Sequence, residues 1–525
     1  MKKGGAGILR RTTHDLPSRC RIRVCTPPMS TIRFLLDNVV QEIALNDSTR
    51  TVLQFLREDL RRAGTKEGCA EGDCGACTVV LAQAQGDELA FRAVNACILF
   101  LATLDGKALF TVESLRRGCA GRLHPVQQAM VDAHGSQCGF CTPGFVMSLF
   151  ALYKSDARPD VAGVQDAISG NLCRCTGYRP IVDAGLAMRA LPLADDADPL
   201  FAAGQGAMSQ AERSLLSKLN AIRPTRGKTH GAPDRQLIAP VTVAELTQAL
   251  HQQPQATLLA GGTDVGLWVT KQLRELNTVI YLGGVTQLNT VAVLDGHLCI
   301  GAGVTLTDAI PTITEQYPAL AELFRRFASV PVRNSGTLVG NIANGSPIGD
   351  SMPALIALRS TLRLRSAEGV RELPLEAFYR DYQVNALAAG EFVESLLIPL
   401  PADNAVIASY KLSKRDEQDI SAVCAAFRLV LEGEVVRDIG IAFGGMAAIP
   451  KRASNTERRL LDQPWNAQTL AAAQAALAED FTPLSDMRGS ADYRLRAAAA
   501  GLQRFYLQTR TRGALSERDL NVFAS

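Results

Sequence analysis

Eight of the thirteen cysteines in this chain of 525 residues fall into two groups of four, and these groups constrain the fold most. The first group combines C-x4-C-x2-C with a later cysteine: Cys69, Cys74, Cys77 and Cys97. The second group combines C-x2-C with C-x-C: Cys138, Cys141, Cys173 and Cys175. Four thiolates can hold a two-iron, two-sulfur cluster, and the first spacing is typical of plant-type ferredoxins. Two such clusters on one chain predict a protein that carries electrons.

Zinc is the alternative metal for both groups, because four thiolates also form a common structural zinc site. In the first group the four-residue gap fits zinc poorly, since zinc knuckles usually pair two short C-x2-C hairpins. Gly68, Gly72 and Gly75 lie between its cysteines, and glycine can take positive φ, which lets the backbone wrap a cluster closely. For the second group the spacing alone leaves zinc open.

Length and composition bound the remaining possibilities. The chain is too long for one ordinary core, and 47% apolar with 20% charged residues is typical of globular proteins. The net charge of +3 is spread along the chain, which argues against nucleic acid or an anionic membrane as partner. No apolar run approaches the roughly 20 residues that span a bilayer. An odd cysteine count in a large chain argues against a disulfide scaffold, so we expect a cytoplasmic protein.

The first 28 residues are basic and lack the apolar stretch of a secretory signal. Met29 directly precedes the first strand-like pattern, so residues 1–28 are interpreted as a tail or as a misassigned start. An arginine-rich transit peptide is the second interpretation of the same residues.

Periodicity divides the rest of the chain. Short strands and a helix with a capping box at Thr51 and Gln54 predict a β-grasp, ferredoxin-like domain around the first group. Helical periodicity and Thr142-Pro143 at a helix start predict a helical bundle around the second group. The predicted multidomain α+β chain has a ferredoxin-like domain (29–112), a helical domain (113–192), a linker (193–232), an α/β domain (233–405) and a C-terminal α+β domain (406–516).

Two glycine-rich stretches stand out in the α/β domain. One is Leu258-Leu-Ala-Gly-Gly-Thr-Asp-Val-Gly266, and the other runs from Asn334 to Asp350. Glycines let backbone N–H groups approach a pyrophosphate, while Thr, Ser and Asn side chains supply further hydrogen bonds. Neither stretch is a Rossmann G-x-G-x-x-G, and each alone is equally consistent with a pair of tight turns.

Longer motifs carry a family resemblance. Gln137-Cys-Gly-Phe-Cys-Thr-Pro-Gly144 and Gly170-Asn-Leu-Cys-Arg-Cys-Thr-Gly-Tyr-Arg-Pro180 closely resemble the helical two-iron cluster domain of the molybdenum hydroxylases, which include xanthine dehydrogenases and aldehyde oxidases. The two glycine stretches, in this order, resemble the FAD domain of the same family. The charged run from Lys411 to Ile420 resembles the loop near the flavin and NAD site of xanthine dehydrogenases. The resemblance to this family extends over nearly all residues from Met29 to the C-terminus.

The resemblance implies an FAD-binding domain at 233–405, a flavoprotein domain at 406–516, and a [2Fe-2S] cluster on each cysteine group. Asp350 would bind the nucleotide part, Phe327 would pack on the flavin ring, and Lys411 would lie nearby. Phe327 is also consistent with a helix core. The implied FAD-binding residues are Leu258, Leu259, Ala260, Gly261, Gly262, Thr263, Asp264, Val265, Phe327, Thr337, Leu338, Val339, Gly340, Asn341, Asp350 and Lys411.

The order of cluster, cluster and flavin most resembles the small subunit of bacterial-type xanthine dehydrogenases. This implies that a partner large subunit carries molybdopterin and hydroxylates a purine, in a heterotetramer of two small and two large subunits. Electrons would pass from the second cluster to the first, then to FAD and NAD+, and no residue of this chain would act as a catalytic acid or base. The alternatives are a self-standing iron–sulfur flavoprotein carrier or NADH diaphorase, and the small subunit of another molybdenum hydroxylase.

Overall fold

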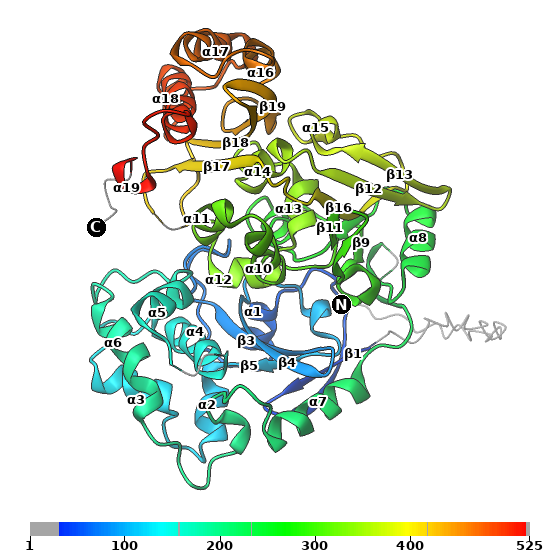
Figure 1. The fold of residues 1–525 in the computed structure, drawn as a ribbon. Helices are drawn as coiled ribbons and strands as arrows, with labels where there is room; N and C mark the ends of the chain where they lie inside the picture. Colours follow the sequence, from blue (N-terminus) through cyan, green and yellow to red (C-terminus); the bar gives the residue numbers. More distant parts are fainter. Residues whose placement is uncertain (1–30, 156–157, 233, 417, 521–525) are drawn as a thin grey trace, which may run out of the picture.

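The computed structural model describes residues 31–155, 158–232, 234–416 and 418–520 (Figure 1). The basic segment 1–28 and the alternative start at Met29 lie outside the described residues. The described chain folds into four consecutive units, a β-grasp domain, a helical bundle, an α/β domain and a C-terminal α+β domain. The predicted fold class is therefore confirmed.

The first unit is a five-stranded sheet of order β2-β1-β5-β3-β4, in which β1 and β5 are parallel and the other pairs antiparallel. Asp37 and Asn38 form the first hairpin turn with positive φ, which Asp and Asn tolerate better than most residues. The capping box of Thr51 and Gln54 begins the helix that packs on this sheet. The elements are β1 Thr31–Leu36, β2 Val39–Ala44, α1 Val52–Gln54, its π-helical continuation Phe55–Asp59, β3 Thr78–Gln85, β4 Glu88–Asn95, a 3-10 turn Leu101–Leu104 and β5 Ala108–Phe110.

The second unit is a helical bundle built around α4. Most of α4 is buried, because it packs on strand β3 on one side and on the other helices of the bundle (Figure 1). One hydrophobic core therefore joins this bundle to the first sheet. The helices are α2 Val112–Gly118, α3 Pro125–Asp132, α4 Thr142–Ser155, α5 Val161–Ile168, α6 Arg179–Ala187 and a 3-10 turn Met188–Ala190.

The segment predicted as a linker is ordered along much of its length. It contains the 3-10 turn Pro199–Phe201 and helix α7 Gln210–Ile222. Leu215, Leu219 and Ile222 recur at helical spacing and are buried in the same core as the first sheet, so α7 straps the two cysteine-bearing units together. The following hairpin of β6 Lys228–Ala232 and β7 Arg235–Ala239 begins the third unit before the expected boundary at 233, because the polar residues of β6 conceal a strand.

The third unit contains two main sheets flanked by helices and a small antiparallel pair, β14-β15. The smaller sheet has the order β6-β7-β9-β8, with β7, β9 and β8 parallel, and the larger antiparallel sheet has the order β10-β11-β16-β12-β13. Its strands are β8 Thr257–Leu259, β9 Thr278–Tyr281, β10 Val291–Leu294, β11 His297–Gly301, β12 Thr361–Ser366, β13 Gly369–Pro374, β14 Tyr379–Asp381, β15 Val384–Asn385 and β16 Phe392–Pro399. Its helices are α8 Val243–Gln252, α9 Val265–Thr270, α10 Leu306–Gln316, α11 Ala321–Arg325, α12 Val330–Ser335, α13 Leu338–Asn344, α14 Ser351–Ala357 and α15 Leu375–Phe378, with 3-10 turns at Leu282–Gly284, Thr286–Leu288 and Pro318–Leu320.

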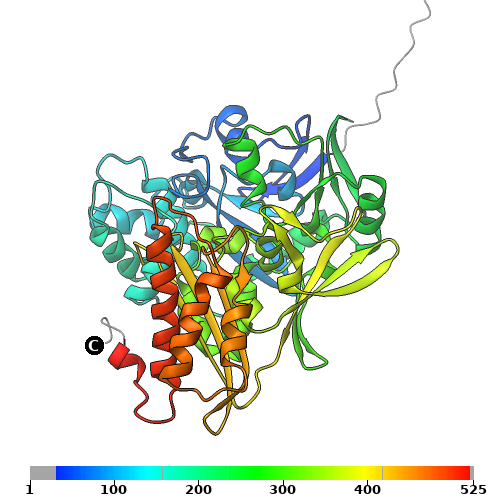
Figure 2. The same ribbon diagram turned by 90° about the horizontal axis from the view of Figure 1, so that it is seen from above.

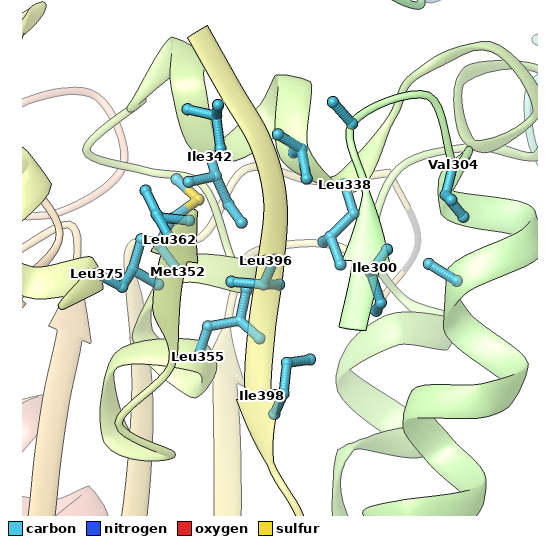
Figure 3. Packing of buried hydrophobic residues seen from close by; sticks show 14 of the residues in the cluster. Ile300, Val304, Leu338, Ile342, Met352, Leu355, Leu362, Leu375, Leu396 and Ile398 are labelled. Atoms are coloured by element: carbon cyan, nitrogen blue, oxygen red, sulfur yellow. The ribbon is translucent and has the colours of Figure 1, made fainter. Parts of the chain in front are cut away.

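The core of this unit lies between the larger sheet and helices α13 and α14. Leu396 and Ile398 of β16 belong to one buried cluster with Ile342 of α13 and Leu355 of α14 (Figure 3). Each of these side chains is fully buried, so burial of apolar surface fixes α13 and the loop before it against the sheet. That loop and α13 itself belong to the second glycine-rich stretch.

The C-terminal unit is a four-stranded antiparallel sheet covered on one face by three helices (Figure 2). Phe427 on the sheet stacks on Phe505 of α18, with ring centroids 5.0 Å apart. The elements are β17 Ala405–Leu412, β18 Val423–Glu432, β19 Val435–Gly444, β20 Lys451–Arg452, α16 Ser454–Leu460, α17 Ala467–Asp480, α18 Ala491–Thr509 and α19 Glu517–Leu520. Among the residues that the structure describes, no helix is both long and apolar enough to cross a membrane.

Candidate cluster sites and flavin cavity

The first quartet consists of Cys69, Cys74, Cys77 and Cys97. Cys69 and Cys74 lie on the loop before β3, Cys77 ends that loop, and Cys97 follows β4. The Cys69 thiol makes hydrogen-bonding contacts with the thiols of Cys74 and Cys97, and the Cys77 thiol makes one with Cys97. The fold therefore brings together all four cysteines that the spacing singled out.

Polar groups around this quartet face the sulfur atoms. The backbone N–H groups of Glu71 and Cys74 donate to Cys69 Sγ at 3.5 and 3.3 Å. The buried side chain of Asn95 donates to Cys77 Sγ at 3.9 Å. Donors of this kind stabilise negative charge on sulfur and tune the reduction potential of an iron–sulfur cluster.

The four thiols lie close enough together to shift one another's pKa values. Hydrogen bonds from the thiols of Cys74 and Cys97 hold the pKa of Cys69 far below its ordinary value. The contact with Cys69 in turn raises the pKa of Cys74 and of Cys97. Negative charge is thus favoured on Cys69 Sγ, toward which the neighbouring thiols donate.

The second quartet consists of Cys138, Cys141, Cys173 and Cys175. The first two precede helix α4, and the last two lie on the loop between α5 and α6. Thiol contacts join Cys141 to Cys173 and Cys138 to Cys175. Burial, followed by the contact with Cys173, raises the pKa of Cys141 to about 12. Cys138 and Cys175 are exposed, so this quartet lies at the surface.

Each quartet supplies the four thiolates that a two-iron, two-sulfur cluster needs, two for each iron. In the first quartet the thiol contacts form a chain from Cys74 through Cys69 and Cys97 to Cys77. In the second quartet they form two pairs, Cys141 with Cys173 and Cys138 with Cys175. Both arrangements fit such a cluster.

The two glycine-rich stretches line one cavity of about 540 Å³. Its size and its mixture of apolar walls and convergent polar groups are typical of a cofactor site. The predicted residues that line it are Leu258, Ala260, Gly261, Gly262, Thr263, Asp264, Val265, Phe327, Thr337, Val339, Gly340 and Asn341.

Close backbone contact holds the two stretches together. A β-carbon at Gly261 would lie 1.9 Å from the carbonyl oxygen of Ser335, so only glycine permits this approach. Thr337 caps α13 by accepting a hydrogen bond from Gly340 N at 2.9 Å. The cavity wall is therefore backbone-rich, as a pyrophosphate site requires.

Four predicted flavin residues lie elsewhere. Leu259 and Leu338 are buried in the hydrophobic core, where they anchor the two loops from behind. Asp350 and Lys411 form a buried ion pair with a 2.5 Å contact, and Ser421 Oγ donates to the other Asp350 oxygen at 2.6 Å. Neither charged group lines the cavity, and their predicted role toward the nucleotide stays a prediction.

Other lining residues were missed by sequence reasoning. They are Trp268, Leu306, Asn344, Leu387 and Val393. Trp268 could have been found, since it follows Val265 at helical spacing, whereas the others belong to no motif. Asn344 donates to Asp264 at 3.0 Å, and burial raises the pKa of the Asp264 carboxyl.

Helix α9 connects the cavity to the first quartet. A β-carbon at Gly266 would lie 2.5 Å from the carbonyl oxygen of Ile98, the residue after ligand candidate Cys97. At the other end of the helix, Thr270 Oγ1 donates to Ala70 O at 2.7 Å and Lys271 Nζ donates to Cys69 O at 3.1 Å. The cavity and the first quartet are thus neighbouring sites.

Known families match consecutive parts of the chain. Residues 35–102 match the 2Fe-2S iron-sulfur cluster binding domain, and residues 111–186 match the [2Fe-2S] binding domain. Residues 233–401 match the FAD binding domain in molybdopterin dehydrogenase, and residues 408–509 match the CO dehydrogenase flavoprotein C-terminal domain. The predicted cofactors, two [2Fe-2S] clusters and FAD, are thereby confirmed.

Individual relatives cover the same span. Xanthine dehydrogenase of Emericella nidulans is 32% identical over 93% of this chain and 40% of its own length, and aldehyde oxidase 1 of Bos taurus is 30% identical over 88% and 38%. The chain therefore spans about two fifths of the curated relatives it matches.

Two solved structures are also similar to part of the chain. A carbon monoxide dehydrogenase chain from Hydrogenophaga pseudoflava is 28% identical, with a TM-score of 0.48 over 51% of this chain and 93% of that one. A quinoline 2-oxidoreductase chain from Pseudomonas putida 86 is 28% identical, with a TM-score of 0.48 over 53% and 97%. The four matched domains and the relatives at about 30% identity show that the chain belongs to the molybdenum hydroxylase family. It corresponds to the iron–sulfur and FAD electron-transfer part of such an enzyme.

Proposed function

We propose that this electron-transfer module is the small subunit of a xanthine dehydrogenase. A partner chain would carry molybdopterin and hydroxylate a purine, and this chain would deliver the electrons to NAD+. FAD suits that task because it exchanges single electrons with iron–sulfur clusters and a hydride with a nicotinamide. The eight cysteines are assigned as cluster ligands, and the loops at 258–265 and 337–341 are assigned to FAD.

The observation that carries the proposal is the series of adjoining sites with one exposed end. The flavin cavity contacts the first quartet through α9, and the first quartet contacts the second through the loop at Leu172, whose N–H donates to Cys74 O at 3.0 Å. Only the second quartet has exposed thiols. An electron donor on another chain would therefore meet the module at Cys138 and Cys175.

Apolar side chains surround that exposed end. Phe140 and Leu172 are 48% and 42% exposed, and Tyr178 is 37% exposed beside them. Tyr178 Oη accepts a hydrogen bond from Cys173 N at 3.0 Å, which ties the ring to the cysteine loop. Exposed apolar groups gathered at a functional site are typical of a protein interface, which supports a partner subunit at this face.

Supporting evidence for a nucleotide acceptor lies at the charged run after Lys411. Arg326 on the helix beside the cavity donates to the carbonyl of Lys411 and to Ser413 Oγ, and it pairs with Asp416. Asp419 accepts from the backbone N–H groups of Lys414 and Arg415, which shapes the run into a compact loop. The loop is thereby held against Arg326, which directly precedes the cavity-lining residue Phe327. A basic loop near the cavity would suit the diphosphate of NAD+.

Purification from the native source with metal, flavin and subunit analysis tests the proposal. We expect a molybdenum-bearing chain in equal amount, an assembly of two copies of each subunit, a cytoplasmic origin, and xanthine-dependent reduction of NAD+. Turnover of aldehydes, carbon monoxide or nicotinate without any purine would refute the substrate assignment. NADH-dependent dye reduction by a chain with no partner would instead support a self-standing diaphorase.

A further inference from the structure

The two cysteine loops meet at a joint built around one buried side chain, that of Asn171. This residue is 2% exposed and lies two positions before Cys173. Its Nδ2 donates to Gly75 O at 3.0 Å and to Thr78 Oγ1 at 3.2 Å, both in the first unit. Its Oδ1 accepts from Ser148 Oγ of α4 at 2.7 Å. One amide thus uses both donors toward the first unit and its acceptor toward the second.

Two glycines, Gly75 and Gly144, allow the two loops to approach Asn171 and each other. A β-carbon at Gly75 would lie 2.1 Å from Gly170 O and 2.4 Å from the Asn171 amide nitrogen. A β-carbon at Gly144 would lie 2.1 Å from Gly75 O. Real β-carbons do not come this close to backbone oxygens, so the joint has no room for a larger residue.

The joint also contains a direct backbone hydrogen bond between the two cysteine loops. Leu172 N donates to Cys74 O at 3.0 Å, so a single hydrogen bond links the residue before Cys173 to a first-quartet cysteine. The Asn171 side chain fixes this contact, because it donates to the carbonyl of Gly75, the residue directly after Cys74.

We infer that Asn171 is a positioning residue for electron transfer between the two quartets. The inference rests on the proposed function, since it requires a cluster on each quartet. In the step, one electron leaves a reduced cluster and enters an oxidised one; no covalent bond changes and no proton moves. Asn171 sets the distance and the hydrogen-bonded contact across which that electron passes.

Two variants disturb the joint in different ways. Asn171→Asp keeps the shape of the side chain and removes the two N–H donors toward Gly75 and Thr78. Gly144→Ala keeps Asn171 and inserts a methyl group where Gly75 O now lies. Ser148→Ala is the matched control, because it removes the contact at Oδ1 and leaves both donors of Asn171 in place.

The first readout is the magnetic interaction between the two clusters in dithionite-reduced protein at low temperature. We expect Asn171→Asp and Gly144→Ala to retain both cluster signals and full iron content with a weaker spin–spin splitting. The second readout is the growth of the second cluster's signal after flash photoreduction of the flavin, with the first cluster as internal reference. This step should slow by about 10- to 100-fold, the range typical when a residue that orients metal ligands is removed.

The outcomes separate positioning from mere stabilisation. Unchanged splitting and unchanged relative rate in either iron-replete variant would overturn the inference, as would loss of a cluster from both variants. A Ser148→Ala protein that matches Asn171→Asp would also overturn it, because general loosening would then suffice. Neither readout needs NAD+ or a purine, so a wrong acceptor or substrate leaves the test intact. A wild-type chain without two cluster signals would overturn the proposed function and this inference together.

Discussion

In the first quartet Cys77 and Cys97 are only 1% and 2% exposed, whereas in the second quartet Cys138 and Cys175 are exposed. The other two cysteines of each quartet are partly exposed, so the first quartet is the more enclosed of the two. The first quartet lies beside β3, β4 and helix α9, and the second lies at helix ends with apolar side chains around it. The same four-thiol chemistry therefore serves two tasks. An enclosed site suits transfer within the chain, and an exposed site suits exchange with a partner.

The largest expected difference lies in what each quartet contributes to stability. Cys97→Ala should remove half of the iron and destabilise the chain strongly, because Cys97 belongs to a core shared with the flavin loop residues Leu259 and Val265. A structural metal contributes on the order of 10 kcal/mol to a small domain, so loss of the first domain and of bound FAD is expected. Iron analysis, flavin content and thermal unfolding measure this.

The matched variant is Cys175→Ala. It should also remove half of the iron, but its exposed position gives it few packing contacts to lose, so FAD and the main unfolding transition should remain. Equal destabilisation by the two changes would show that exposure does not distinguish the quartets.

An intermediate effect is expected from pH, and it is confined to the second quartet's domain. His124 is fully buried; its Nδ1 accepts from Val126 N, and its Nε2–H donates to Phe201 O at 2.9 Å. Burial lowers the pKa of His124 to about 4, from 6.5 in an unfolded chain. The unfolded chain binds more protons between these values, so this stability is fully present above pH 6.5 and is lost as pH falls toward 4. The free energy of unfolding should decrease by about 3 kcal/mol over this pH range.

This expectation can be checked by lowering the pH from 7 to 4.5 and measuring the release of iron as the domain unfolds. The described part of the first domain has no histidine, so its cluster should survive longer. His124→Asn keeps a helix-capping acceptor without a titrating ring and should flatten the pH dependence. Simultaneous release of both clusters from wild-type protein in this range would argue against the assignment to His124.

The smallest expected effect concerns the reduction potential of the first cluster. In the wild-type protein the Asn95 side chain donates to Cys77 Sγ, and this hydrogen bond favours the more negative, reduced state of the cluster. Asn95→Leu removes the donor and should therefore lower the reduction potential. One hydrogen bond of about 1 kcal/mol corresponds to a decrease of roughly 40 mV for a one-electron couple. An EPR-monitored redox titration measures the shift, and the second cluster should keep its potential. A shift of both clusters would mean that Asn95 acts through the joint between them.

The sequence predicted the parts of the site that depend on contiguous residues. The spacing of Cys69, Cys74 and Cys77 fixes a loop by itself, and the glycines of 258–265 indicate close backbone approach without any knowledge of the fold. The capping box at Thr51 was equally local. These features need only a few neighbouring residues, so a motif is enough to identify them.

Features produced by packing between distant segments could not be predicted. Val393 reaches the flavin cavity only because β16 lies between β11 and β12. The buried ion pair of Asp350 and Lys411 joins two domains, and no sequence motif near either residue predicts it. The unequal exposure of the two quartets is also a tertiary property, since it depends on how α9 and α4 pack against the first cysteine loop.

EPR of dithionite-reduced chain, with and without an external paramagnetic relaxation agent, tests the central claim most directly. The account predicts two distinct S = 1/2 signals, one from each diiron quartet. The agent should broaden the second quartet's signal more strongly than the first, because two cysteines of the second quartet are exposed and two of the first are buried. Fewer than two signals, or equal broadening of both, would contradict it.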